Sequence, residues 1–126
     1  MAAHLAPWIS VPSVREAIDF YVAAFSARSV YELPDEHDNV VVAKLAIGDG
    51  GADLWLQEEP GLTVPEAGGA IRMILTVDDP DVAYAQAVAA GARVVAPMYE
   101  GHGWRIGRIA DPFGHHWEIG KQLPAE

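Results

Sequence analysis

The stretch Asp111-Pro112-Phe113-Gly114-His115-His116-Trp117-Glu118-Ile119 is the most informative part of this chain. Its first four residues are typical of a turn, because aspartate, proline and glycine favour the backbone conformations of tight turns. The residues after the turn alternate, with Trp117 and Ile119 facing one way and polar residues facing the other. The segment therefore predicts a turn followed by a strand over 115–119.

The residues before this segment complete one structural unit. Residues 70–77 alternate as a strand, and Asp79-Pro80 supplies an N-cap followed by a proline at the first helical position. The helix is predicted to end before Gly91, a residue type favoured just past a helix C-terminus. Two further strands are expected, over 92–96 and 103–110. This half of the chain thus has the order strand–helix–strand–strand–strand.

The first half of the chain repeats that order. Alternation predicts a strand over 5–11, and the Ser-x-x-Glu form of a capping box at Ser13 indicates the start of a helix. Apolar residues at helical spacing continue that helix to about Ser26. Three strands follow, over 28–33, 40–47 and 52–57. Because the element order occurs twice, the sequence predicts an internal duplication.

We therefore expect an α+β protein with one domain over 1–126, built from two tandem βαβββ modules. Module one covers 5–57 and module two covers 70–119. Between them lies a linker over 58–69, which is rich in proline and glycine and has no periodicity. A length of 126 residues fits one domain of ordinary size.

The composition excludes several classes of function. The chain has no cysteine, which excludes disulfides, thiolate nucleophiles and iron–sulfur clusters. With 18 acidic and 8 basic residues its formal net charge is −10, so we expect it to bind neither nucleic acid nor an anionic membrane. The N-terminus lacks both a basic start and a long apolar run, and a cytoplasmic location is expected.

The duplicated unit resembles the vicinal oxygen chelate superfamily, which includes glyoxalase I, the bleomycin-resistance proteins and the extradiol dioxygenases. The residues that carry the resemblance are Ala17-Ile18-Asp19-Phe20-Tyr21 with Ala24-Phe25, the helix entry Val77-Asp78-Asp79, the helix exit Ala89-Ala90-Gly91-Ala92, and the Asp-Pro-Phe-Gly-His segment that leads to Trp117. That last segment is most similar to the branch of small glyoxalase-like and bleomycin-resistance-like proteins. The resemblance covers about residues 5–120. It implies a curved mixed sheet around a cleft, with the helices on the outer face, and a homodimer.

Alternation along the strands assigns the side chains that would face this cleft. The predicted ligand-binding residues are Trp8, Ser10, Trp55, Gln57, Arg72, Ile74, Trp104, His116 and Glu118. Their indole rings suit a planar or cationic organic molecule, through stacking and cation–π attraction. Arg72 and Glu118 either bind opposite ends of a polar ligand or form an internal ion pair. Arg108, on the same face as Trp104, is expected to be solvated, with an anion-binding edge as the alternative.

The resemblance also implies four inward positions that hold His or Glu ligands in the metal enzymes of the superfamily. In this chain those positions hold Ala6, Trp55, Arg72 and Glu118, so only one carries a suitable ligand. One ligand cannot hold a catalytic metal, and an arginine would repel the cation. No metal or other cofactor is therefore expected. The alternative is a displaced metal site made of His4, His102, His116 and Glu118.

These observations favour a metal-independent small-molecule-binding protein that resembles the bleomycin-resistance type. The expected partner is a small organic ligand, planar or cationic, held in an aromatic cleft. Two other functions remain open. One is a glyoxalase-like lyase or isomerase in which Glu118 is the general base. The other is a dimerising module whose cleft is filled by its own side chains.

Overall fold

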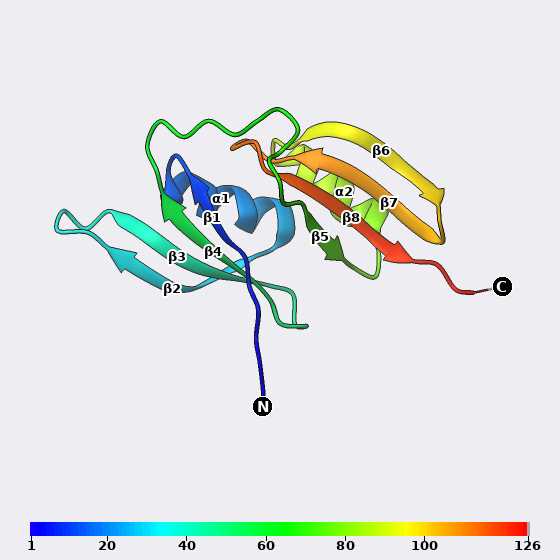
Figure 1. Ribbon diagram of the computed structural model, residues 1–126, viewed down its shortest axis with the longest axis horizontal. Coiled ribbons are helices and arrows are strands. Elements are labelled where there is room, and N and C mark those ends of the chain that lie inside the picture. Colours follow the sequence, from blue (N-terminus) through cyan, green and yellow to red (C-terminus); the bar gives the residue numbers. More distant parts are fainter. Residues whose placement is uncertain (126) are drawn as a thin grey trace. The chain divides into compact units, whose positions relative to one another are not determined.

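The chain folds into two compact units, seen in a computed structural model that describes residues 1–125 (Figure 1). The first unit is Met1–Leu62, and the second begins at Thr63. Each contains one helix and one four-stranded sheet with both parallel and antiparallel pairs. The α+β class and the two similar modules predicted from the sequence are confirmed.

The two units have the same element order and the same sheet topology. The first contains β1 (Trp8–Val11), α1 (Val14–Phe25), β2 (Arg28–Pro34), β3 (Val40–Ile47) and β4 (Ala52–Glu58). The second contains β5 (Met73–Thr76), α2 (Pro80–Ala89), β6 (Arg93–Gly101), β7 (Trp104–Ala110) and β8 (His116–Gln122). The sheet orders are β1-β4-β3-β2 and β5-β8-β7-β6, and in both the first strand runs parallel to the last.

Helix α1 begins and ends where its capping residues predict. The Ser13 hydroxyl accepts a hydrogen bond from the Glu16 amide at 3.2 Å. A second free amide, that of Val14, donates to Glu58 Oε1 of β4 at 3.0 Å and so ties the helix start to the sheet. Ser26 ends the helix in the left-handed conformation, with φ 55°. The helix packs on β3 and β4, and its buried face covers Leu54 and Leu56.

Helix α2 covers one face of the second sheet, where it packs on β6, β7 and β8. Asp79 caps its N-terminus by accepting from the Val82 amide, and Gly91 follows its end with φ +119°. The core beneath the helix consists of alternate residues of the strands: Leu75, Ile109, Trp117 and Ile119. The intervening residues lie on the opposite face, which carries no helix.

Two strands are shorter than the alternation predicts. The first begins at Trp8 rather than residue 5, and β5 covers Met73–Thr76 rather than 70–77. The pairing explains the difference, since β1 pairs with β4 only from Trp8 onward and β5 with β8 only from Met73 onward. Alternation identifies side-chain faces, whereas the length of a strand depends on its hydrogen-bonded neighbour.

Two strands of the second sheet are longer than predicted. β6 continues past 96, through Pro97, to Gly101. It tolerates the proline because it is an edge strand, with register shifts between Val94 and Tyr99. β8 continues to Gln122 because its antiparallel neighbour β7 pairs with it that far.

The part of the chain that the structure describes contains no helix long and apolar enough to cross a membrane.

Candidate functional site

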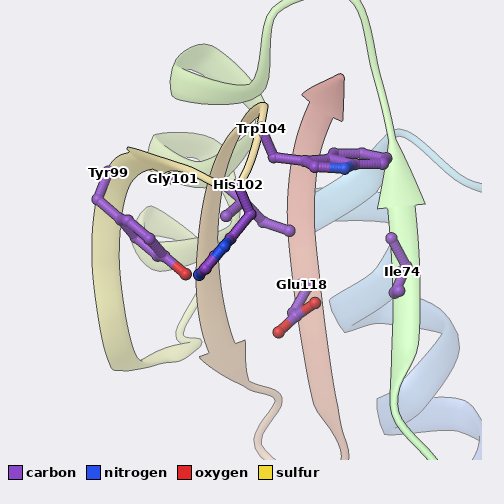
Figure 2. A pocket seen from close by; sticks show the side chains of 7 residues that line it. Ile74, Tyr99, Gly101, His102, Trp104 and Glu118 are labelled. Atoms are coloured by element: carbon purple, nitrogen blue, oxygen red, sulfur yellow. The ribbon is translucent and has the colours of Figure 1, made fainter. Parts of the chain in front are cut away.

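The helix-free face of the second sheet contains a hollow of about 270 Å³. It is lined by Ile74, Tyr99, Gly101, His102, Trp104, Ile106 and Glu118. Figure 2 shows Tyr99 and His102 on the β6 side, Glu118 on β8, and the Trp104 indole extending toward β5. The lining therefore combines the indole of Trp104, the phenol of Tyr99 and two isoleucines with a carboxylate and an imidazole.

The sheet register determines how these side chains are arranged. Glu118 of β8 lies between its cross-strand partners Ile74 of β5 and Arg108 of β7. Trp104 pairs with Gln122, four residues further along β8, which corresponds to roughly 13 Å at the rise of a strand. The aromatic end and the carboxylate end of the hollow are thus separated along β8, and Ile106 lies between them on the same face of β7.

The turn between β6 and β7 brings His102 to the hollow. His102 and Gly103 connect the two strands with φ values of 54° and 81°, the positive angles of a tight hairpin turn. A positive φ is uncommon for a residue other than glycine, although histidine adopts it more often than most. The turn presents the imidazole at the rim of the hollow next to Trp104.

Glu118 is contacted by two arginines. Its Oε1 lies 3.5 Å from Arg72 Nη1 and 3.5 Å from Arg108 Nη2. The three side chains are partly exposed, at 23% for Glu118, 44% for Arg72 and 28% for Arg108. The Arg72–Glu118 ion pair considered from the sequence is present, but the cluster contains a second guanidinium and has a net charge of +1.

Arg105 lies on the opposite face of β7 and takes no part in the hollow. It forms a two-pronged ion pair with Asp81 of α2, with Nη2–Oδ1 and Nε–Oδ2 distances of 2.8 and 3.2 Å. The hydrogen bond from Arg105 lowers the pKa of Asp81 below its usual value, and the same bond raises the pKa of Arg105. This pair connects the helix to the sheet.

The first unit presents a different polar and aromatic surface on its own helix-free face. Trp8 stacks on Trp55 with ring centroids 5.8 Å apart, and Tyr31 meets Trp55 edge-on at 5.9 Å. Lys44 Nζ lies 5.3 Å from the Trp55 ring centroid. Beside the rings, Gln57 Nε2 donates to Ser10 Oγ at 2.7 Å, and His4 Nε2 lies 2.7 Å from Asp53 Oδ2. Trp8, Ser10, Trp55 and Gln57, predicted from the sequence as ligand-binding residues, are thus gathered on one face.

His116 is covered by the protein's own backbone. It is only 4% exposed, and its Nε2 lies 3.0 Å from the carbonyl oxygen of Glu66. Gly68 passes directly over the imidazole, where a Cβ would come within 2.6 Å of the ring. The backbone at Gly68 also has φ +89°, so glycine is required there for two reasons. His116 shares a strand face with Glu118, but the segment over 64–68 separates it from the hollow.

The residues at the family's metal positions do not fit a metal ion. In the first unit these positions hold Ala6 and Trp55, and an indole N–H is a donor only. In the second unit they hold Arg72 and Glu118, which face each other as an ion pair. Within residues 1–125 no three His, Cys, Asp or Glu side chains gather in a group that could hold a metal ion. As for the displaced set of histidines, His4 contacts Asp53 and His116 contacts Glu66.

The structure thus brings three of the predicted residues, Ile74, Trp104 and Glu118, to one hollow. The ligand-binding residues predicted from the sequence did not include Tyr99, Gly101, His102 and Ile106. The signal that could have found His102 is its position in a Gly-His-Gly turn immediately before Trp104. Tyr99 could be placed only after β6 was known to continue past Pro97.

Comparisons with other proteins agree with this fold. Residues 2–119 match the family described as the Glyoxalase/Bleomycin resistance protein/Dioxygenase superfamily. An uncharacterised protein of Mycobacterium bovis is 35% identical over 129 residues, which cover 94% of this chain and 83% of the relative. An uncharacterised protein of Mycobacterium tuberculosis is also 35% identical, with 94% of this chain and 74% of the relative covered.

Solved structures show the same architecture. TioX from Micromonospora sp. ML1 is 25% identical, with a TM-score of 0.76 over 97% of this chain and all of that chain. A superfamily member from Sphaerobacter thermophilus reaches a TM-score of 0.77 at 21% identity, covering 97% of this chain and 98% of that one. TnmS3 from Streptomyces sp. CB03234, named as an antibiotic binding protein, has a TM-score of 0.65 at 23% identity, with 99% of each chain covered. From the match over residues 2–119, this chain belongs to the Glyoxalase/Bleomycin resistance protein/Dioxygenase superfamily.

Proposed function

We propose that this protein binds a small planar organic molecule, without a metal ion, in the hollow of its second unit. The observation that carries the proposal is the convergence of Trp104, Tyr99 and Ile74 with the polar groups of Glu118 and His102 around one open cavity. Small-molecule sites are typically concave and largely apolar, with a few polar groups that orient the ligand.

The size and chemistry of the hollow restrict the ligand. A volume of about 270 Å³ suits a molecule of one or two rings rather than a long polymer. An indole face and a phenol ring favour a planar body by stacking. Ile74 is 59% exposed on this face, so a ligand would also remove an apolar side chain from water.

Glu118 connects the hollow to two positively charged side chains. Its Oε1 is already shared between two guanidinium groups. We therefore assign Glu118 the role of holding the Arg72 and Arg108 guanidinium groups beside the hollow.

Two features of other proteins support the proposal. TnmS3, which has the same fold, is by its name an antibiotic binding protein. The name of the family to which the chain belongs also includes bleomycin resistance proteins.

The Trp8–Trp55 surface of the first unit also offers exposed aromatic area, since Trp8 is 53% exposed. We propose that Trp8, Ser10, Trp55 and Gln57 form a separate ligand-contact surface on the first unit, and that the protein is a homodimer.

The proposal can be tested by isothermal titration with a neutral planar probe, naphthylbutanamide, in the presence of EDTA. We expect Trp104→Leu to weaken binding about tenfold, because it removes the stacking surface and part of the apolar contact. Val82→Ala is a matched control, since Val82 is 60% exposed on α2, away from the hollow. It should leave the affinity unchanged. Equal affinities of wild type and Trp104→Leu, or binding that EDTA abolishes, would contradict the proposal.

A further inference from the structure

The charge around the hollow differs from that of the rest of the protein. The chain as a whole has a formal net charge of −10, and several of its basic side chains each face one carboxylate: Arg15 faces Glu32, Lys44 faces Asp53, and Arg105 faces Asp81. Beside the hollow, in contrast, Arg72 and Arg108 share the single carboxylate of the lining residue Glu118. One positive charge is therefore left without a balancing negative charge within the cluster.

The two guanidinium groups also retain capacity to bind. Each has five N–H donors, and the contacts to Glu118 Oε1 involve one terminal nitrogen of each at 3.5 Å, the outer limit of a hydrogen bond. Neither contact has the bidentate geometry of a strong arginine–carboxylate pair. Both side chains are partly exposed, so an anion can reach them.

From these observations we infer that the ligand is a planar aromatic acid, whose anionic group binds Arg72 and Arg108 while its ring system stacks on Trp104. This inference rests on the proposed function and specifies the class of ligand. It replaces the cationic ligand considered from the sequence. The sheet register supports the arrangement, because Arg108 and Trp104 lie on the same face of β7, and Arg108 contacts Glu118, which lines the hollow together with Trp104. A short flexible chain between ring and acid would span the separation along β8.

The test compares three probes that share a naphthyl ring and a four-carbon chain and carry an anionic, a neutral or a cationic end group: naphthylbutyrate, naphthylbutanamide and naphthylbutylamine. We expect wild-type protein to bind the acid at least tenfold more tightly than the amide, and the amine most weakly. The acid-to-amide affinity ratio should decrease as the salt concentration is raised, since the charges of Arg72 and Arg108 are partly exposed and are screened by ions. This comparison needs no variant, so it remains decisive even where a substitution impairs folding.

Variants then identify the residues that cause the preference for the acid over the amide. Arg72→Gln and Arg108→Gln should each lower the acid-to-amide affinity ratio several-fold, because the charged acid loses more than the neutral amide when a guanidinium is removed. Glu118→Gln should raise the affinity for the acid several-fold, because it removes the competing carboxylate. An internal ion pair without a binding role predicts no such gain. Arg105→Gln is the matched control on the same strand, and it should leave the ratio unchanged because Arg105 faces α2.

The outcomes separate this inference from the proposed function. An acid that binds no better than the amide, an amine that binds best, or an unchanged ratio in both arginine variants would overturn the inference. If the amide still binds in a Trp104-dependent manner in such a case, the proposed function stands. Failure of all three probes to bind would contradict the proposed pocket and the inference together.

Discussion

Asp111 shows how a single side chain organises the segment that is most informative about the fold. It is only 4% exposed, and its Oδ1 accepts from the amides of Phe113 and His115 at 3.0 and 2.9 Å. Its Oδ2 accepts from the indole N–H of Trp117 at 3.0 Å. The carboxylate therefore holds the turn and also fixes a core tryptophan of β8. The Asp-Pro-Phe-Gly segment has a structural role here rather than a chemical one.

Replacing Asp111 with alanine should destabilise the fold by about 2–4 kcal/mol, because three donors lose their acceptor in a buried site. Asp111→Asn should cost less, since its amide oxygen can still accept from the turn. Urea unfolding monitored by circular dichroism measures both. If the two variants lose the same stability, the turn hydrogen bonds are not the main contribution of Asp111.

His116 illustrates what alternation along a strand can and cannot reveal. Its position two residues before Glu118 correctly indicates a shared strand face. It does not reveal that the segment over 64–68 lies on the imidazole, because that contact depends on a loop distant in sequence. Trp104 and Glu118 were predictable as members of a site because both lie on the strand face that alternation assigns to the cleft, and both line the hollow.

At the level of elements, Asp81 and Arg105 connect the first turn of α2 to β7. Because Arg105 lowers the pKa of Asp81, the folded state binds the Asp81 proton less readily than the unfolded chain does. The stability from this pair is present above the usual aspartate pKa. It is lost as the pH falls through the lowered pKa of the folded state.

We therefore expect Arg105→Gln to be less stable than wild type at neutral pH, with a difference that shrinks toward zero in strongly acidic solution. Chemical unfolding of both proteins at a series of pH values measures this difference. The double variant Asp81→Asn with Arg105→Gln is the control, and its stability relative to Asp81→Asn alone should not vary over the same acidic range. A deficit in Arg105→Gln that stays constant from neutral to acidic pH would contradict the assignment.

The ends of an element could be predicted from the sequence where they depend on local capping residues. They were harder to predict where they depend on pairing with a neighbouring strand. Ser13, Asp79 and Gly91 mark helix ends because capping is local. The continuation of β6 through Pro97 was not predictable, because only an edge position makes proline acceptable and edge position is a property of the whole sheet. The missed strand end includes Tyr99 and Gly101, and with them one side of the hollow.

At the scale of the whole molecule, the duplication places a helix-free face in each unit, and that of the second unit contains a hollow with both aromatic and charged lining. The metal positions of the family hold Ala6, Trp55 and Arg72 in addition to Glu118. We therefore expect Zn²⁺, Ni²⁺, Mn²⁺ or Fe²⁺ to leave the melting temperature within about 1 °C of the metal-free value. A metal present at a hundredfold excess over its Kd would add about 2.7 kcal/mol, a shift of several degrees. Differential scanning fluorimetry after EDTA treatment measures the effect, and a rise of several degrees would show that a metal site exists.

The proposed homodimer has an equally direct measurement. Light scattering coupled to size-exclusion chromatography should give twice the chain mass of 13.5 kDa. Dilution into the nanomolar range tests whether the association is stable. A mass that stays at one chain at micromolar concentration would remove the homodimer from the proposal and leave the hollow of the second unit unaffected.

The central claim is that a planar ligand occupies the hollow beside Trp104. The chain's four tryptophans make this testable in one NMR titration, because each has one indole N–H signal. Trp104 lines the hollow, Trp8 and Trp55 stack on each other in the first unit, and Trp117 is buried at 3% exposure. On adding naphthylbutanamide, the Trp104 signal should shift in a saturable manner while the Trp117 signal stays fixed as an internal reference. Shifts of Trp8 and Trp55 would report the additional contacts proposed for the first unit. A saturable titration that leaves the Trp104 signal unmoved would contradict the account.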